Sequence, residues 1–326
     1  MVVETRLPGK RDSIFVGVPC DSAFQRAKTC VFRPKTRGQN RFFVTTPRFS
    51  SLKKAFLSQN RLFGHCSGMP ADVLLLSRQY VLILQHKSKK TTKITMISTF
   101  GDSIMRGVMS VAKKDNGKPL YKISEQNFVS RCERRLGVRI LNFACFGSTT
   151  TQGIKHMDRY GNEVKGSNVA VFEYGGNDCD FDWAAVAADP QKQHQPKVAL
   201  KRFVQQYNTL LDCVINMNIR PVILSLPLIE PDRFFETVSF GLNKNNIMQW
   251  LGGKTIRISH WHEMYNLELF KLARQRDVPI VDITSPFLEQ ADYSDYLCTD
   301  GIHPNERGHA LIAEVLLSKA KDFLLQ

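Results

Sequence analysis

A serine, an aspartate and a histidine in this 326-residue chain can together carry out nucleophilic catalysis. Ser103 ends the tripeptide Gly101-Asp102-Ser103, while Asp300 and His303 stand three residues apart near the other end of the chain. A serine hydroxyl becomes a nucleophile near neutral pH when an imidazole takes its proton, and a carboxylate fixes the tautomer of that imidazole. The three residues therefore predict a Ser-His-Asp site, although Gly-Asp-Ser by itself is more often an ordinary turn.

Two further segments can supply the hydrogen-bond donors that this chemistry needs. Gly147 follows an apolar run and can present a free backbone N–H, and Asn177 stands within Gly175-Gly176-Asn177-Asp178 after the next run. Together with the backbone N–H of Ser103, these groups would form a three-donor oxyanion hole. Each segment alone is also an ordinary turn. All of them, however, lie where predicted strands end, and such ends meet at one edge of a parallel sheet.

Short β-rich runs alternate with helical patterns from about residue 94 onward. The β-rich runs cover residues 94–100, 138–144, 169–174, 221–226 and 279–283. Between them, apolar residues recur at helical spacing, most strongly from Leu200 to Ile215. Ser124 is the expected N-cap of an earlier helix that ends before Gly137, and Pro304 is expected to start the last helix. This alternation predicts an α/β fold with a mainly parallel five-stranded sheet between two layers of helices.

Two stretches interrupt the alternation, one at 179–196 with Trp183 and one at 229–260 with Trp250. Insertions after strands usually lie over the carboxyl ends of the sheet, so we expect these two to shape the substrate pocket. Their tryptophans can stack on a sugar ring or pack inside a lid. The segment His260-Trp261-His262 offers two metal ligands but no third one, and we predict no metal site.

The positive charge of the chain lies in its first part. Residues 1–95 hold 18 of the 45 Lys and Arg residues and 4 of the 30 Asp and Glu residues, a net of +14, which leaves 27 and 26, a net of +1, for residues 96–326. A basic segment with interspersed Phe makes non-specific nucleic-acid binding a rival activity. Because the triad residues lie in the nearly neutral part, we expect no specific nucleic-acid partner.

Residues 1–93 show no sustained period of 2 or 3.6 residues, and we expect no stable domain there. They can be a basic flexible arm, an Arg-rich transit peptide, or the product of an over-long reading frame whose true start is Met96. The last interpretation is favoured because Met96 directly precedes the first catalytic motif. The catalytic domain is then predicted to span residues 94–326.

The eight cysteines form no CxxC pair, which predicts reduced thiols and a cytoplasmic location. The apolar stretch at residues 73–84 is interrupted by polar residues, so neither a signal peptide nor a membrane span is predicted. The sequence leaves the oligomeric state open.

At the motifs above, the chain resembles the SGNH (GDSL-type) hydrolase family over about residues 94–326. The Gly-x-Ser-x-Gly elbow of α/β-hydrolases, a rival serine-hydrolase fold, is absent. Ile104 stands where the family usually has leucine, at a packing position. The matching pieces, in the order of the family, are Gly101-Asp102-Ser103-Ile104, Gly147, Gly175-Gly176-Asn177-Asp178 and Asp300-Gly301-Ile302-His303.

The resemblance implies a flavodoxin-like three-layer α/β/α sandwich and a serine esterase that needs no metal or organic cofactor. It implies that Ser103 is the nucleophile, His303 the base and Asp300 the residue that orients it, with an oxyanion hole formed by Ser103, Gly147 and Asn177. The expected substrate is a small-molecule carboxylic ester with a short acyl chain, or an acetylated carbohydrate. A thioester or lipid hydrolase and an acyltransferase are alternatives on the same fold.

Overall fold

A computed structural model describes residues 94–111 and 119–324 of the chain. The predictions made for residues 1–93, including the basic arm and its nucleic-acid binding, lie outside the described residues. None of the helices in the two described ranges combines the length and the hydropathy of a membrane span.

A five-stranded sheet forms the centre of the fold, and each pair of neighbouring strands in it is parallel. The strands are β1 (Met96–Gly101), β4 (Arg139–Asn142), β5 (Val169–Glu173), β6 (Arg220–Leu224) and β7 (Ile280–Val281). Their spatial order is β4-β1-β5-β6-β7, which is the order of flavodoxin-like folds. Each strand overlaps one predicted β-rich run, and the predicted fold class is confirmed.

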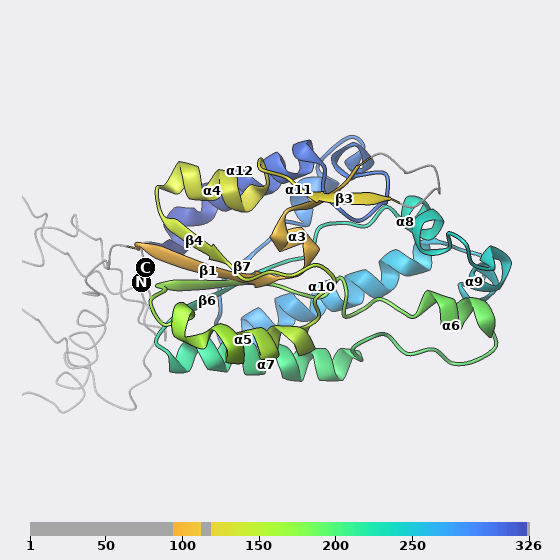
Figure 1. Cartoon of the computed structure of the whole chain (residues 1–326), viewed down its shortest axis with the longest axis horizontal. Coiled ribbons are helices and arrows are strands. Elements are labelled where there is room, and N and C mark those ends of the chain that lie inside the picture. The colour runs from red at the N-terminus through yellow and green to blue at the C-terminus, as the bar shows by residue number, and fades with distance from the viewer. Residues whose placement is uncertain (1–93, 112–118, 325–326) are drawn as a thin grey trace, which may run out of the picture. The chain divides into compact units, whose positions relative to one another are not determined.

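Helices cover both faces of this sheet (Figure 1). One face carries α5 (Thr150–Val164), α7 (Leu200–Asn216) and α10 (Ile256–Arg276). Phe203 and Tyr207 of α7 pack there with Phe172 of β5. The other face carries α4 (Phe128–Leu136), α11 (Ser285–Leu288) and α12 (Glu306–Leu324). On that face, Phe128 and Ile312 share an apolar cluster with strand residues such as Ile97. Packing in these two clusters holds the strands in register. The carboxyl ends of the five strands therefore lie together at one edge of the sheet.

The two insertions build a third apolar cluster of their own. They contain α6 (Trp183–Ala188), α8 (Pro231–Val238) and α9 (Lys244–Trp250), which lie beyond the end toward which the strands run (Figure 1). Trp183 is buried and packs edge to face against Phe181 and Trp250. Packing among the insertions therefore occupies this tryptophan, and it is not free to stack on a sugar.

A short antiparallel hairpin was not anticipated from the sequence. It consists of β2 (Val108–Val111) and β3 (Leu120–Ile123), and it follows the one-turn helix α3 (Ser103–Arg106). The four side chains of β3 are exposed. Because the strand buries neither face, it lacks the alternation of apolar and polar residues that would reveal it.

The expected N-cap Ser124 is wrong by one turn. The helix α4 begins at Phe128, and Asn127 caps it by accepting a hydrogen bond from the Ser130 N–H at 2.9 Å. Ser124 instead accepts from the Gln126 N–H in the preceding turn. Both residue types cap well, so spacing alone did not separate them. Gly137 does end this helix in the left-handed conformation, as predicted.

The expected start of the last helix at Pro304 is also wrong. The helix α12 begins at Glu306, and the side chain of Asn305 accepts from the N–H groups of Arg307 and Gly308 at 2.9 and 3.1 Å. Pro304 forms a bridge with Leu297 and so closes the loop between them.

The segment His260-Trp261-His262 lies in the helix α10 rather than in a strand. Residues two apart on a helix face different directions. Accordingly, His262 is buried while His260 is exposed. The pair does not present two ligands to one point.

A buried histidine makes the stability of this fold depend on pH. His309 of α12 is fully buried against Phe128 of α4, and burial lowers its pKa to about 4. In the unfolded chain the pKa of His309 is near 6.5, so between about pH 6.5 and pH 4 this histidine binds a proton in the unfolded chain but not in the folded protein. Stability from this site is present above pH 6.5 and falls as the pH drops toward 4.

Replacement of His309 by leucine is expected to remove this part of the pH dependence. Between pH 7 and pH 4.5, the free energy of unfolding of the wild type should fall by about 2 to 3 kcal/mol more than that of the variant. Urea denaturation of both proteins at the two pH values measures the difference. Parallel decreases would show that His309 does not carry the effect.

Candidate active site

Ser103 lies at the turn between the central strand β1 and the helix α3. Asp102 caps this helix, because its Oδ1 accepts a hydrogen bond from the N–H of Ile104 at 2.8 Å. Ser103 is itself buried to 6% exposure. The turn thus holds the hydroxyl at the carboxyl end of the sheet, with its position set by a rigid strand on one side and a capped helix on the other.

Asp300 and His303 both lie in the tight loop that precedes α12. Oδ1 of Asp300 accepts from the backbone N–H groups of Ile302 and His303, each at 3.2 Å. Gly301 has φ +78°, and a Cβ there would lie 2.5 Å from the backbone nitrogen of Phe234 in α8. A glycine is therefore required for the loop to bend and to approach α8 so closely.

The structure brings Ser103, His303 and Asp300 into one hydrogen-bonded line, although the first two are 200 residues apart. Nε2 of His303 lies 2.8 Å from Oγ of Ser103, and Nδ1 lies 2.6 Å from Oδ2 of Asp300. All three side chains are buried. With Nδ1 donating to the carboxylate, Nε2 is free to accept the proton of the serine hydroxyl.

Gly147 follows β4 in a turn beside this line. Its φ of +70° is a conformation that favours glycine, and Cys145 in the same turn donates to the carbonyl of Gly101 at 3.1 Å. Among the described residues, the N–H of Gly147 donates to no protein acceptor. It is available to a bound anion next to the serine turn.

Asn177 follows β5 and contacts the serine turn directly. Its Nδ2 donates to Oδ2 of Asp102 at 2.9 Å. The neighbouring Asp178 accepts from both the N–H and the hydroxyl of Thr150, which ties the loop after β5 to the start of α5. Burial raises the pKa of Asp178 to about 7 despite these hydrogen bonds. The five residues predicted for the site are thus gathered at one edge of the sheet.

Two aromatic rings beside His303 were not recognised in the sequence. Tyr121 of β3 lies 5.2 Å from the imidazole between ring centres, and Phe146 lies 6.0 Å from it. The two rings also touch each other, and they are 40% and 58% exposed. Phe146 directly precedes Gly147, and its position next to a predicted site residue could have indicated that it lies near the site. We call these two residues the aromatic lip.

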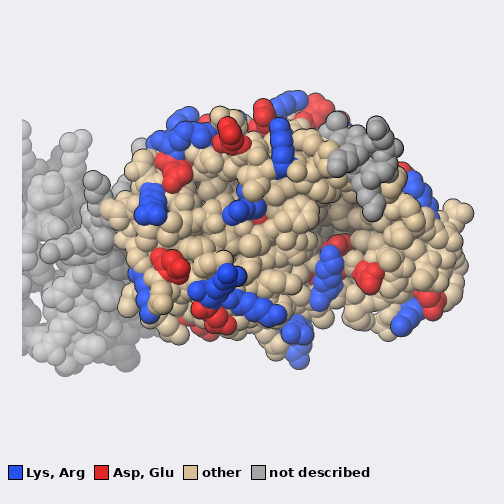
Figure 2. Space-filling view, in the orientation of Figure 1, with Lys and Arg blue, Asp and Glu red and all other residues tan. Residues whose placement is uncertain are grey.

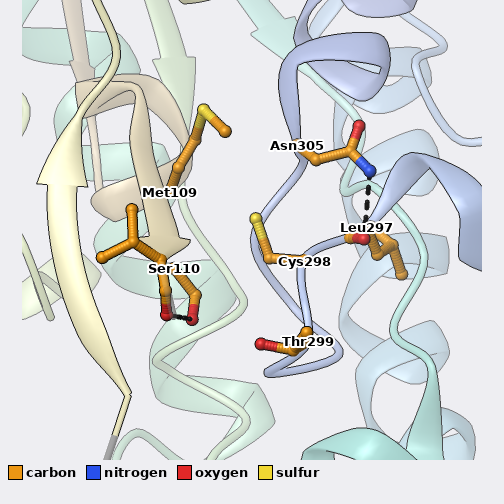
Figure 3. Close-up of a pocket in the computed structure, with 7 residues that line it drawn as sticks. Met109, Ser110, Leu297, Cys298, Thr299 and Asn305 are labelled. Atoms are coloured by element: carbon orange, nitrogen blue, oxygen red, sulfur yellow. Dashed lines mark hydrogen bonds between the residues drawn. The ribbon is translucent and has the colours of Figure 1, made fainter. Parts of the chain in front are cut away.

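A cavity of about 390 Å³ lies beside the site (Figure 3). It separates β2 from the loop that leads to Asp300, and it is mostly apolar. None of the three residues of the hydrogen-bonded line belongs to its wall. The cavity is therefore a neighbour of the reacting groups rather than the place where they meet. Its lining consists of Met109, Ser110, Val111, Leu297, Cys298, Thr299 and Asn305.

The surface around the fold carries charges of both signs. On the face shown in Figure 2, the Lys and Arg side chains are interspersed with Asp and Glu over the described surface. This mixture agrees with the nearly neutral count for residues 96–326, 27 basic against 26 acidic side chains.

A sequence model of the GDSL-like lipase/acylhydrolase family matches residues 99–311 of the chain. The matched range includes the serine turn, the turns after β4 and β5, and the Asp300-His303 loop. No curated protein sequence matches significantly.

Several solved structures resemble the fold at low sequence identity. The lipase/acylhydrolase from Enterococcus faecalis is 16% identical, with 70% of this chain and 96% of that chain covered and a TM-score of 0.47. A catalytic mutant of an acetylxylan esterase from Geobacillus stearothermophilus is 16% identical, with 72% and 99% covered and a TM-score of 0.48. The psychrotrophic esterase EstA from Pseudoalteromonas sp. is 14% identical, with 71% and 100% covered and a TM-score of 0.47.

Proposed function

Because the chain belongs to the GDSL-like lipase/acylhydrolase family and is a carboxylic ester hydrolase, we propose that it works through an acyl-serine intermediate on Ser103. The observation that carries the proposal is the unbroken line from Ser103 through His303 to Asp300, with heavy-atom distances of 2.8 and 2.6 Å. The catalytic domain is assigned to residues 94–326.

In the first half of the reaction, Oγ of Ser103 attacks the ester carbonyl while Nε2 of His303 takes the hydroxyl proton. Asp300 stabilises the imidazolium that forms. The negative charge on the carbonyl oxygen is met by the N–H groups of Ser103 and Gly147 and by the side-chain amide of Asn177. His303 then gives its proton to the leaving alcohol, and the C–O bond of the ester breaks.

In the second half, a water molecule attacks the acyl-serine. His303 takes a proton from the water, the same oxyanion hole stabilises the second tetrahedral intermediate, and the proton returns to Oγ of Ser103 as the acid leaves. These steps need no metal or organic cofactor.

For the substrate, we favour esters that join a short acyl chain to an alcohol other than a sugar. Acetylated carbohydrates, whose alcohol is a sugar, are the less favoured class. The support is the aromatic lip, Tyr121 and Phe146, which exposes apolar surface next to His303. Ile123 lies on the same face of β3 as Tyr121 and is also exposed. Of the two tryptophans that could stack on a sugar, Trp183 is buried within the insertions, and Trp250 packs against Phe181 and Trp261.

A panel of p-nitrophenyl esters and acetylated sugars tests this proposal. The wild type is expected to hydrolyse the p-nitrophenyl esters, with kcat/KM rising from acetate to butanoate as the acyl chain reaches the aromatic lip. The double variant Tyr121→Ala, Phe146→Ala should lose about thirtyfold in kcat/KM on butanoate and much less on acetate, because each of the two lost apolar contacts contributes about 1 kcal/mol.

The matched control is Ile215→Ala, which removes an exposed apolar side chain from the end of α7 at the opposite edge of the sheet. It should leave the chain-length profile unchanged. Preference for acetylated sugars, or equal losses on acetate and butanoate in the lip variant, would contradict the substrate assignment. Absence of hydrolysis across the whole panel would contradict the proposed activity on these esters.

A further inference from the structure

Two carboxyl groups that the proposed mechanism does not use lie buried behind the serine turn. Asp102 and Glu173 are each 1% exposed. Glu173 ends β5 in register with Gly101, and a Cβ on Gly101 would lie 3.1 Å from Oε2 of Glu173. Two successive N–H groups of one turn donate to them, that of Ile104 to Asp102 and that of Met105 to Glu173, so the two carboxyl groups lie next to each other. Among the described residues, neither of them pairs with a Lys or Arg.

The other partners of this pair are N–H donors. Oδ1 of Asp102 accepts from the Ile104 N–H at 2.8 Å, and Oδ2 accepts from Nδ2 of Asn177 at 2.9 Å. Glu173 accepts from the N–H of Met105 at 3.3 Å. The two carboxyl groups therefore connect the turn that carries Ser103 to the end of β5. Through Asp102 they also contact the side-chain amide of Asn177.

Two neighbouring carboxyl groups in a dry site cannot both be ionised, and one shared proton allows a hydrogen bond between them. Burial, followed by the neighbouring Asp102, raises the pKa of Glu173 well above its usual range. Burial also raises the pKa of Asp102, but the hydrogen bonds from Ile104 and Asn177 oppose this shift. Glu173 is accordingly the protonated member, and it donates to the Asp102 carboxylate.

We propose that Glu173 and Asp102 share one proton and together hold Asn177 with its amide nitrogen turned toward Asp102, so that the second N–H of this nitrogen faces the oxyanion. The inference rests on the proposed oxyanion role of Asn177. Asp102 and Glu173 are positioning residues, because they act through Asn177 and touch no reacting atom. The shared proton also leaves one negative charge, instead of two, behind a site that must stabilise an anion.

The orientation of this amide matters because its two ends have opposite effects. With the amide reversed, Oδ1 of Asn177 would face both the Asp102 carboxylate and the oxyanion, and it would repel both. Loss of one oxyanion donor typically lowers kcat about 10²- to 10³-fold.

A double-mutant cycle tests whether Asp102 acts through Asn177. In Asp102→Asn, the new side-chain carbonyl still accepts the hydrogen bond from the Ile104 N–H. The new NH₂ group then faces the NH₂ group of Asn177, and because two donors cannot bond to each other, the amide of Asn177 has to turn over. We expect Asp102→Asn and Asn177→Ala each to lower kcat about 10²-fold with KM changed less than about threefold, and the double variant to lose little more than either single one. Losses that multiply to about 10⁴ would overturn the inference.

A second pair of variants tests the shared proton. Glu173→Gln keeps a neutral donor toward Asp102 and an acceptor for Met105, so kcat should stay within about threefold of the wild type, whereas Glu173→Ala should lose about tenfold or more. Infrared spectra at neutral pH should show a protonated-carboxyl band that loses intensity in Glu173→Gln, and the remaining intensity belongs to Asp178, whose pKa is about 7. Equal losses in the two variants, or an unchanged band in Glu173→Gln, would overturn the inference.

Asp282→Asn is the matched control, because Asp282 also accepts backbone N–H groups just after a strand of this sheet but contacts none of the site residues named above. It should leave kcat unchanged, and urea denaturation should show that every variant is folded. If Asn177→Ala alone kept wild-type kcat, the proposed oxyanion hole would fail, and the role of the pair toward it would fail as well. If Asn177→Ala lost activity but the cycle was additive, only the role of Asp102 toward Asn177 would fail.

Discussion

Replacement of Ser103 by alanine is expected to lower the hydrolysis of a p-nitrophenyl butanoate ester by at least about 10⁴-fold. The hydroxyl is the atom that forms the acyl intermediate, and its hydrogen bond to Nε2 of His303, 2.8 Å long, is the path by which its proton leaves. Without the oxygen, only the oxyanion donors and substrate binding remain to accelerate attack by water. Initial rates at saturating ester measure the loss.

The same substitution should leave the fold nearly unchanged. Alanine fills most of the volume of serine, and Asp102, rather than Ser103, caps the helix α3. Ser110→Ala is a matched control, because Ser110 is a buried serine on β2 whose hydroxyl, within the described part of the chain, reaches only the carbonyl of Val111. Both variants should unfold near the wild-type temperature, and only Ser103→Ala should be inactive. Wild-type turnover in Ser103→Ala would rule out the acyl-serine mechanism.

The three inner strands of the sheet, β1, β5 and β6, could be predicted because they are buried on both faces. Strand β5, for example, is a continuous apolar run in which Phe172 is fully buried, so composition alone marks it. The hairpin strand β3 could not be found in this way, since its side chains are exposed and its sequence has no pattern to follow. Helix starts were misplaced where two good capping residues stand close together, as Ser124 and Asn127 do.

The meeting of the candidate site residues at one edge of the sheet could be predicted because strand ends and motif positions coincide. The sequence places Ser103, Gly147 and Asn177 after three strands that turn out to be neighbours in the sheet, so their approach follows from topology. Glu173 and Tyr121 were missed for a different reason. Their places in the site depend on contacts between distant parts of the chain, Glu173 with the N–H of Met105 and Tyr121 with His303, and spacing along the chain carries no trace of such contacts.

Asp300→Asn is expected to lower kcat about 10⁴-fold, although it changes a single atom. Oδ1 of Asp300 is held by the N–H groups of Ile302 and His303, each at 3.2 Å, while Oδ2 lies 2.6 Å from Nδ1 of His303. Asparagine can satisfy the two backbone donors only with its carbonyl oxygen. Its NH₂ must then face Nδ1 of His303.

An NH₂ group in that position donates to Nδ1 and forces the proton of the neutral imidazole onto Nε2. Nε2 then faces Ser103 as a donor and cannot take the hydroxyl proton, so the base is lost while every atom of the loop keeps its place. Kinetics together with ¹⁵N chemical shifts of His303 measure the loss and the tautomer. Asp295→Asn, at an exposed acid in the 3-10 helix Tyr293–Tyr296 that pairs with Arg307 of α12, should change neither. Retention of the wild-type tautomer in Asp300→Asn would contradict the assigned role of Asp300, because the hydrogen bonds of this loop leave the asparagine no other orientation.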